Sequence, residues 1–258
     1  MRLRFLGTGT SHGIPVIGCP CPVCTSGAPA NARTRSSVLL ESAAARLVVD
    51  TTPEFRLQAL AAGLTTLDAV LFTHAHADHI FGLDDVRIFN WRTKRPMPIY
   101  GAAETLDTVR RRFSYAFEDG QRGGGKPSLE MRPVDGPFEA AGLRITPLEV
   151  RHGELAVTAF RVGEREGGPE LAYATDCNAI PAGTMDALRG LDLLVLDALG
   201  KGRHPTHFSL DEAVAVAREL APRRTLFTHI SHSLDHEETN AGLPAGMALA
   251  HDGLIVDL

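Results

Sequence analysis

The sequence contains no uninterrupted apolar run long enough to cross a lipid bilayer, so we expect no membrane span. Its 26 basic and 31 acidic residues are mixed along the chain and give a formal net charge of -5. A basic stripe typical of a nucleic-acid footprint is absent, which argues against nucleic acid as the partner. The chain enters a strand pattern at residue 2 without the apolar core of a signal peptide, so we expect a cytoplasmic protein.

Cysteine is scarce, with four residues in the chain. In the cytoplasm such cysteines are more often metal ligands or free thiols than disulfides. Heptads, low-complexity tracts and short-period repeats are also missing, which excludes a coiled coil or a repeat array. What remains is an ordinary globular composition, 44% hydrophobic and 22% charged over 258 residues. We expect one domain over residues 1–258.

The most informative segment is the string THAHADH at residues 73–79, at the end of a predicted strand. Alternate positions of a strand share a face, so His74 and His76 can address one ion. Asp78 and His79 fall where the chain turns into a helix and can address a second ion. Imidazole nitrogen and carboxylate oxygen are ligands that Zn, Mn and Fe accept. A solvated polar loop is the alternative, but it does not explain this clustering.

Metal-type residues recur where later predicted strands end, at His152, Asp176 and His229. A lone histidine at a strand end is more often a hydrogen-bonded core residue than a ligand. Three such ends, in a chain that already carries the first string, favour a metal site. A carboxylate can bridge two cations through its two oxygens, so Asp176 is the expected bridge.

The rest of the pattern alternates strands and helices in two similar halves. Strands are expected at 2–7, 37–41, 46–50, 68–73, 98–100, 128–134, 143–150, 156–162, 170–175, 192–196, 224–228 and 253–258. Helices are expected at 52–63, 103–117, 185–190 and 209–220, and a helical stretch follows the strand at 68–73 and runs through residue 92. Two sheets packed face to face with helices outside would explain this repetition. The glycine-rich break at residues 119–127 is either a lid beside the site or a plain surface connector.

The H-x-H-x-D-H string, with a later histidine, aspartate and histidine, resembles the metallo-β-lactamase superfamily over almost the whole chain. The resemblance implies an α+β fold, the αββα four-layer sandwich of two mixed β-sheets, with a dinuclear metal site at one edge. It also implies seven ligands for two ions. They are His74, His76 and His152 for one ion, Asp78, His79 and His229 for the other, and Asp176 as the bridge.

Asp50, at the end of an inner strand, resembles the acid that orients ligand imidazoles in this superfamily. Its alternative role is that of a turn residue at the entry to a helix.

Three thiols lie close together in the string GCPCPVC at residues 18–24. Structural zinc favours a closed tetrahedron of four ligands, so Cys19, Cys21 and Cys24 need one more partner. His232, three positions past a predicted ligand, is the fourth residue we expect. Such a zinc would tie the N-terminal loop to the strand end beside the catalytic metals. Three free thiols in a surface loop are the alternative.

Together these features resemble one branch of the superfamily, the phosphoribosyl 1,2-cyclic phosphate phosphodiesterases of phosphonate breakdown. The segments that carry this resemblance are residues 7–15, 19–24, 73–79, 174–176, 204–211 and 228–232. It implies a metal-dependent phosphodiesterase acting on phosphoribosyl 1,2-cyclic phosphate or a related ribose cyclic phosphate. It further implies two divalent ions, Mn or Zn, in the active site, one structural Zn, a small-molecule substrate and a homodimer.

The chemistry that the resemblance implies is attack on phosphorus by a hydroxide held between the two ions. The leaving alkoxide then needs a proton, and His207, just before a predicted helix start, is the expected donor. A loop histidine at a helix entry is the alternative for His207. Asp78 is expected to take part in catalysis, and His204 and Asp197 lie near the same mouth. His12 either contacts the phosphate or fills a turn.

Other functions share parts of this pattern. A nuclease resembling tRNase Z shares the metal string, but it would need a basic arm or patch to hold its polyanionic substrate. A redox protein resembling coenzyme PQQ synthesis protein B also carries a cysteine zinc loop, and oxygen uptake with bound iron would favour it. A non-catalytic metal-binding scaffold is the last alternative.

Overall fold

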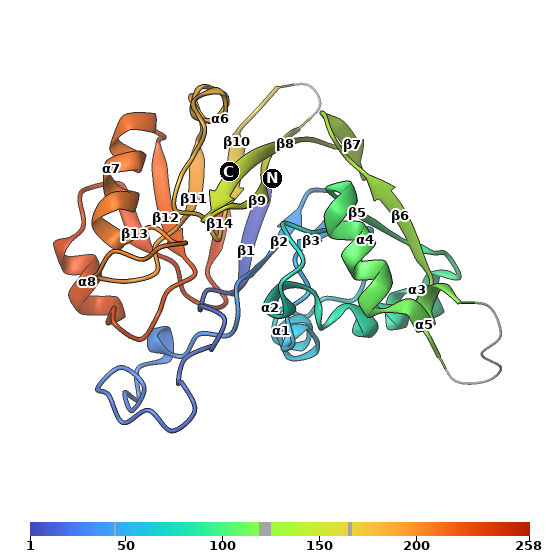
Figure 1. Ribbon diagram of the computed structural model, residues 1–258, viewed down its shortest axis with the longest axis horizontal. Helices are drawn as coiled ribbons and strands as arrows, with labels where there is room; N and C mark the ends of the chain where they lie inside the picture. The colour runs from blue at the N-terminus through green and yellow to red at the C-terminus, as the bar shows by residue number, and fades with distance from the viewer. Residues whose placement is uncertain (44, 119–124, 165–166) are drawn as a thin grey trace.

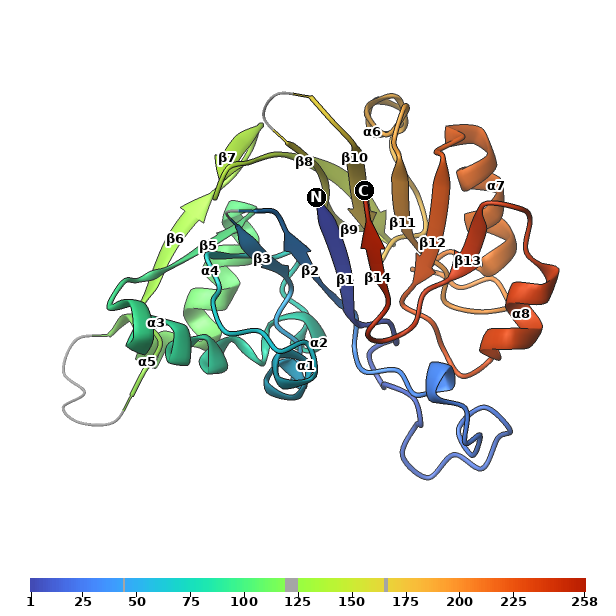
Figure 2. The same cartoon turned by 180° about the vertical axis from the view of Figure 1, so that it is seen from behind.

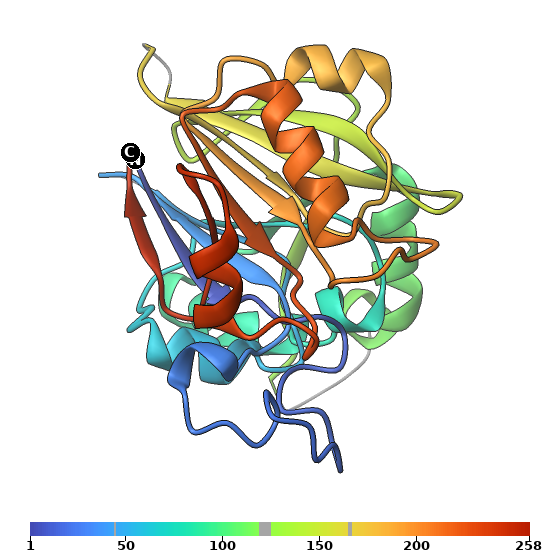
Figure 3. The same ribbon diagram turned by 90° about the vertical axis from the view of Figure 1, so that its left-hand side faces the viewer.

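The structure, a computed structural model, describes residues 1–43, 45–118, 125–164 and 167–258. Its described part forms two β-sheets packed face to face, with helices on both outer sides (Figure 1). A view from the side shows the strands between the two groups of helices (Figure 3). The predicted αββα sandwich is therefore confirmed. Residues 119–124 of the predicted break at 119–127 lie outside the described residues.

The first sheet has seven strands in the order β14-β1-β2-β3-β4-β5-β6 within the described residues. Their bounds are β14 (Ile255–Asp257), β1 (Arg2–Gly7), β2 (Ser37–Glu41), β3 (Arg46–Val49), β4 (Ala69–Leu71), β5 (Met97–Gly101) and β6 (Leu129–Pro133). Pairing is antiparallel from β14 to β3 and parallel from β3 to β6. The antiparallel pair of β1 and β14 brings the two ends of the described chain side by side (Figure 2).

The second sheet also has seven described strands, in the order β13-β12-β11-β10-β9-β8-β7. Their bounds are β13 (Met247–Leu249), β12 (Arg224–Thr228), β11 (Leu193–Asp197), β10 (Glu170–Ala174), β9 (Leu155–Glu164), β8 (Leu143–His152) and β7 (Phe138–Ala140). Strands β10 to β13 are parallel and β7 to β10 antiparallel. Both sheets are therefore mixed, as predicted.

Helices lie outside each sheet (Figure 1). Beside the first sheet are α1 (Phe55–Ala61), α2 (Ala77–Ile80), α3 (Arg87–Thr93), α4 (Ala103–Arg112) and α5 (Ser114–Phe117), with the 3-10 turn η2 (Leu83–Val86) between α2 and α3. Beside the second are α6 (Ala182–Ala187), α7 (Leu210–Leu220) and α8 (His236–Gly242). The 3-10 turn η1 (Pro29–Asn31) belongs to the N-terminal loop.

Alternation along the inner strands produces this layering. In β3, Leu47 and Val49 point into the core between the sheets, while Val48 points to the helices. In β4, Leu71 faces the inner core and Val70 the helices. Burial of each such side chain stabilises the fold by roughly 1.5–3 kcal/mol. Strands covered on both faces must be apolar throughout, as these are.

Several element ends differ from the prediction. The helix expected from residue 52 begins at Phe55, because the Thr52 hydroxyl accepts from Glu54 N–H and donates to Gln58 Oε1 instead of capping the helix. The helix expected at 185–190 lies earlier, as α6. The prediction also missed β7, β13 and α8, which are too short for a clear periodic signal.

Candidate metal centre and active site

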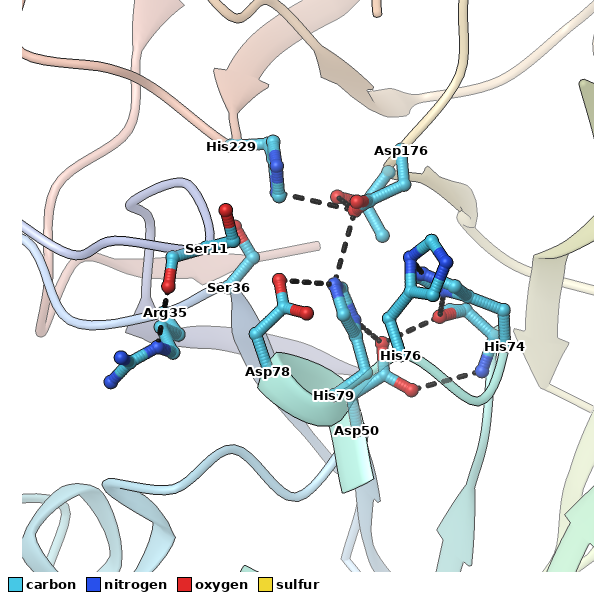
Figure 4. A network of polar contacts seen from close by, with 12 residues as sticks. Ser11, Arg35, Ser36, Asp50, His74, His76, Asp78, His79, Asp176 and His229 are labelled. Atoms are coloured by element: carbon cyan, nitrogen blue, oxygen red, sulfur yellow. Dashed lines mark hydrogen bonds and ion pairs between the residues drawn. The ribbon is translucent and has the colours of Figure 1, made fainter. Parts of the chain in front are cut away.

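The site lies where strands of both sheets end. Asp50 follows β3, Asp176 lies two positions past β10, and His229 follows β12. All three have left-handed backbone, with φ of 63°, 54° and 60°. This conformation costs non-glycine residues on the order of 1–3 kcal/mol each, and such cost is concentrated at functional sites. The sharp turns at these strand ends direct the side chains to a common space (Figure 4).

Asp176 lies at the middle of one group of predicted ligands. Its Oδ1 is 3.3 Å from His79 Nε2 and 3.2 Å from His229 Nδ1. Asp78 Oδ2 lies 3.3 Å from the same His79 nitrogen. Two ligands of one zinc-like ion at a near-tetrahedral angle would be about 3.3 Å apart. The spacing of these four side chains therefore matches a shared ion.

The second group of predicted ligands adjoins the first. His74 Nε2 lies 2.9 Å from His76 Nδ1. The ring of His152 lies 5.3 Å from that of His76 and 5.9 Å from that of His74, between centroids. Ligand atoms of His152 and Asp176 lie within 4.8 Å of each other. All seven predicted ligands are thus brought together, and their division between two ions stays a prediction.

Two buried nitrogens in this cluster show that it fits a cation. His79 Nε2 and His229 Nδ1 face carboxylate oxygens at 3.2–3.3 Å but form no hydrogen bond with any of the described residues. A buried polar atom without a partner costs about 1–3 kcal/mol, so a native site needs something to satisfy it. A divalent ion accepts both nitrogens and neutralises the facing carboxylates at once.

The protonation states suit metal binding at His74, His229 and Asp176, whereas at His79 the nearby Asp176 and Asp50 outweigh burial and raise the pKa, so a metal there must displace a proton. Burial lowers the pKa of His229 to about 4, and burial likewise holds the pKa of His74 well below its usual range, so both imidazoles are neutral at pH 7. Burial alone would raise the pKa of Asp176, but His229 and His79 hold that pKa well below its usual value. Neutral imidazole and ionised carboxylate are the forms that bind metal.

A series of hydrogen bonds behind the cluster fixes the orientation of the ligand imidazole rings. His79 Nδ1 lies 2.7 Å from Asp50 Oδ2, which also accepts from the Thr73 hydroxyl at 2.7 Å. Thr73 Oγ1 in turn lies 3.0 Å from His74 Nδ1. Each contact occupies one ring nitrogen and leaves Nε2 for the metal. The alternative role of Asp50 as a plain turn residue therefore does not describe its contacts. Thr73 is a supporting residue that the sequence reasoning missed.

His207 stands at the edge of this cluster. Its ring stacks on His229 at 4.7 Å and meets His152 at 4.5 Å, between centroids. His207 Nδ1 lies 2.7 Å from Oδ2 of the fully buried Asp197. Asp197 keeps that ring in one orientation, with Nε2 on the side away from the carboxylate. His204 is exposed, with its ring 5.2 Å from that of His207.

Two further predicted residues are placed by the structure. His152 Nδ1 donates to the carbonyl of Thr206 at 2.8 Å, which leaves its Nε2 for a metal. Nothing in the sequence indicated that backbone partner, because it lies on a loop distant in the chain. His12 is exposed on the N-terminal loop, and a role for it at the phosphate stays a prediction.

The predicted zinc ligands also lie together. The Sγ atoms of Cys19, Cys21 and Cys24 are 3.3, 3.5 and 3.5 Å from His232 Nδ1. A tetrahedral zinc would separate sulfur and nitrogen ligands by about 3.6 Å. The Cys24 N–H donates to Cys21 Sγ and lowers the pKa of that thiol to about 7, which favours the thiolate that zinc binds.

Fold and cluster together define a metal-dependent hydrolase of the metallo-β-lactamase fold. Residues 45–230 match the model of the Beta-lactamase superfamily domain. The crystal structure of a new diphosphatase from the PhnP family is 44% identical, with a TM-score of 0.91 over 99% of this chain and 97% of that chain. The chain therefore belongs to the β-lactamase superfamily and, within it, to the PhnP family.

Two curated relatives extend this comparison. An octanoyltransferase of Porphyromonas gingivalis is 36% identical over 259 residues, which cover 98% of this chain and 51% of that protein. The chain thus spans about half the length of this relative. A ribonuclease Z of Mycobacterium sp. (strain KMS) is 30% identical over 207 residues, covering 73% of this chain and 69% of that protein.

The sequence predicted no membrane span, and the helices of the structure test this prediction. Within the described residues, none of them combines the length and the apolar character that a bilayer crossing requires.

Proposed function

We propose that this protein hydrolyses a small phosphodiester, with ribose cyclic phosphates such as phosphoribosyl 1,2-cyclic phosphate as the first substrates to test. The observation that carries the proposal is the buried Asp197–His207 pair beside the seven-residue cluster. His207 Nδ1 is 2.7 Å from Asp197, and its ring lies against His152 and His229. An imidazole held at a metal cluster in this way suits protonation of an alkoxide leaving group.

The seven-residue cluster would hold two divalent ions, Mn or Zn, and the Cys19, Cys21, Cys24 and His232 set a structural Zn. The two ions held by the seven-residue cluster would supply an activated water and would neutralise charge on the phosphate. The chain's own residues position the reaction. Asp50 and Thr73 orient ligand imidazoles, while Asp78 and Asp176 present carboxylates to the cluster.

His207 supports the proton transfer through its fixed geometry. Burial would lower its pKa, but the hydrogen bond to Asp197 and the negative charges of Asp197 and Asp176 together outweigh burial and raise the pKa. The ring therefore keeps its proton nearer to neutral pH and can give it to the leaving oxygen. A sugar alkoxide is a strong base and needs that proton, whereas nitrophenolate does not.

The test combines metal analysis with a diesterase screen. Protein purified without chelator should contain divalent metal at the cluster, and it should turn over a ribose cyclic phosphate and bis-nitrophenyl phosphate. Removal of the catalytic metals should abolish turnover, and Mn or Zn should restore it. Metal-loaded protein that is inactive on every diester would refute the proposal, and salt-sensitive cleavage of tRNA would favour a ribonuclease Z-like function instead.

A second candidate is hydrolysis of a phosphoanhydride, because the structure that is 44% identical is that of a diphosphatase. The two functions differ in their leaving groups. A phosphate leaving group is weakly basic and needs little protonation, so the His207→Ala change should hardly affect a phosphoanhydride. The same change should strongly reduce hydrolysis of a ribose cyclic phosphate.

A further inference from the structure

A cavity of about 440 Å³ opens directly against the metal cluster. His74 and His76 form one side of it. Helix α4 and the β8–β9 hairpin form the other walls, which include Thr105, Arg112 and Leu155. This volume is within the range of small-molecule sites. A phosphodiester with its phosphorus at the cluster therefore has room here for the group attached to phosphorus.

Arg112 is held in place at the mouth of this cavity. Its Nη1 donates to the carbonyl of Ala75 at 2.7 Å, between the predicted ligands His74 and His76. Its guanidinium also lies over the ring of Phe81, 5.8 Å from the centroid. A guanidinium has five N–H donors, so one bond to Ala75 leaves others for a ligand. Arg112 is the one lysine or arginine among the described residues that line the cavity.

The lining combines hydrogen-bonding groups with an aliphatic wall. Thr105 and Arg112, at positions i and i+7 of α4, share one face of that helix. Glu104 and Asp135 add carboxylate acceptors, and Leu155 belongs to an apolar side that also includes Leu148 and Val157. A sugar presents hydroxyls to polar groups and its C–H face to aliphatic ones.

A nucleobase is a poorer match for this cavity. The described residues that line it include no phenylalanine, tyrosine or tryptophan on which a base would stack. The lining holds three carboxylates, those of Glu104, Asp135 and Glu149, and a single guanidinium, so a second phosphate on the sugar would be repelled here and would have to lie outside the cavity. The observations therefore favour the uncharged, hydroxyl-bearing part of a sugar as the group inside the cavity.

We propose that this cavity is the subsite for the sugar of the substrate, and that Arg112 is its specificity-determining residue. The proposal rests on the proposed function, because it takes the phosphate to lie at the metal cluster. Arg112 contacts sugar oxygens from a position fixed by Ala75 and Phe81. Thr105, with only 8% of its surface exposed, supplies a second hydrogen-bonding group.

The test compares two ligands that differ only in the sugar, ribose 1-phosphate and methyl phosphate. Calorimetry with protein loaded with Mn or Zn gives the Kd of each. One charge-assisted hydrogen bond is worth about 1.5–3 kcal/mol, so wild type should bind the ribose ester at least about tenfold more tightly. Arg112→Met should remove most of this preference with metal content unchanged, and Thr105→Val should remove a smaller part of it.

Arg110→Met is the matched control. Arg110 lies on the same helix with its guanidinium over Phe117, outside the cavity lining, so this change should leave the ratio unchanged. Equal affinity of wild type for both ligands would overturn the proposal. Loss of metal in the Arg112→Met protein, together with loss of affinity for both ligands, would also overturn the proposal. Arg112 would then serve only to hold the loop at Ala75.

The two proposals fail in different ways. Hydrolysis of methyl nitrophenyl phosphate reports on the diesterase function alone, since that substrate has no sugar. If the protein hydrolyses this substrate but binds ribose 1-phosphate and methyl phosphate equally well, the sugar subsite is rejected and the diesterase function is kept. A clear preference for ribose 1-phosphate without hydrolysis of any diester rejects the diesterase and keeps the subsite.

Discussion

His79 Nδ1 and Asp50 Oδ2 lie 2.7 Å apart, with both side chains almost completely buried. Asp50 directly follows β3 of the first sheet, and His79 belongs to α2. Their contact therefore fixes the position of the α2 ligands relative to the sheet. Asp50 also accepts from the backbone N–H of Thr73 at 2.9 Å. A single carboxylate therefore orients both ends of the string at residues 73–79.

Asp50→Asn should weaken metal binding by about 10–100-fold, the usual cost of losing such a supporting group. Asparagine tolerates the left-handed backbone at this position, so the strand end should stay intact. Its amide nitrogen, however, cannot accept the hydrogen bonds that both carboxylate oxygens accept now. Chelator competition measures the affinity. Asp68→Asn, at an exposed position, is the control, and equal affinities for the two variants would contradict the prediction.

His207→Ala should lower kcat for a ribose cyclic phosphate by about 10²–10⁴-fold, which is typical for loss of a general acid. Hydrolysis of bis-nitrophenyl phosphate should fall much less, because nitrophenolate leaves without a proton. Metal content, measured by mass spectrometry, should stay normal. His204→Ala, at the neighbouring exposed histidine, should have little effect. An equal loss for both substrates would argue against proton donation.

Asp197→Asn should change the pH dependence of kcat. The hydrogen bond to Asp197 raises the pKa of His207, so loss of the carboxylate should lower that pKa. The acid form of His207 would then be lost at lower pH, and the alkaline limb of the profile should move to lower pH. Asp192→Asn, on the protein surface, is the control and should leave the alkaline limb of the profile in place. A shift of the limb in that variant would indicate a general effect of charge.

His232→Ala should remove one zinc per chain and leave the catalytic cluster loaded. A zinc at 100 times its Kd stabilises a protein by ~2.7 kcal/mol. For a chain of this length that corresponds to a lower Tm by on the order of 5–10 °C, measurable by calorimetry. Cys177→Ala changes the buried cysteine outside the set and should keep the zinc. Retention of full zinc in His232→Ala would exclude this histidine as a ligand.

Arg33→Met should lower the free energy of unfolding by about 1–3 kcal/mol, because two backbone carbonyls would lose this donor and Asn31 Oδ1 would keep only the His236 N–H. Arg33 donates to the carbonyls of Ser231 and Leu234 and to Asn31 Oδ1, at 3.1, 2.9 and 3.1 Å. Two of these acceptors flank His232, so zinc should also be held less firmly. Urea denaturation measures the first effect. A variant as stable as wild type would show that water satisfies these groups.

Local patterns in the sequence were enough for much of the fold. The apolar strands, the capping box in which Ser209 accepts from Glu212 N–H, and the helix at α7 follow from propensity and periodicity within short windows. The short elements β7, β13 and α8 did not, because three to seven residues carry too little periodic signal. Those elements depend on the neighbours against which they pack.

The sequence by itself determined which side chains are available for metal, because the histidines at positions 74, 76 and 79 have few other physical explanations in so short a string. Only the tertiary structure decided how they are used. Contacts such as His152 with the Thr206 carbonyl and Arg112 with the Ala75 carbonyl join segments far apart in the chain. Backbone carbonyls have no sequence signature, so the packing of the two sheets alone brings these groups within hydrogen-bond distance.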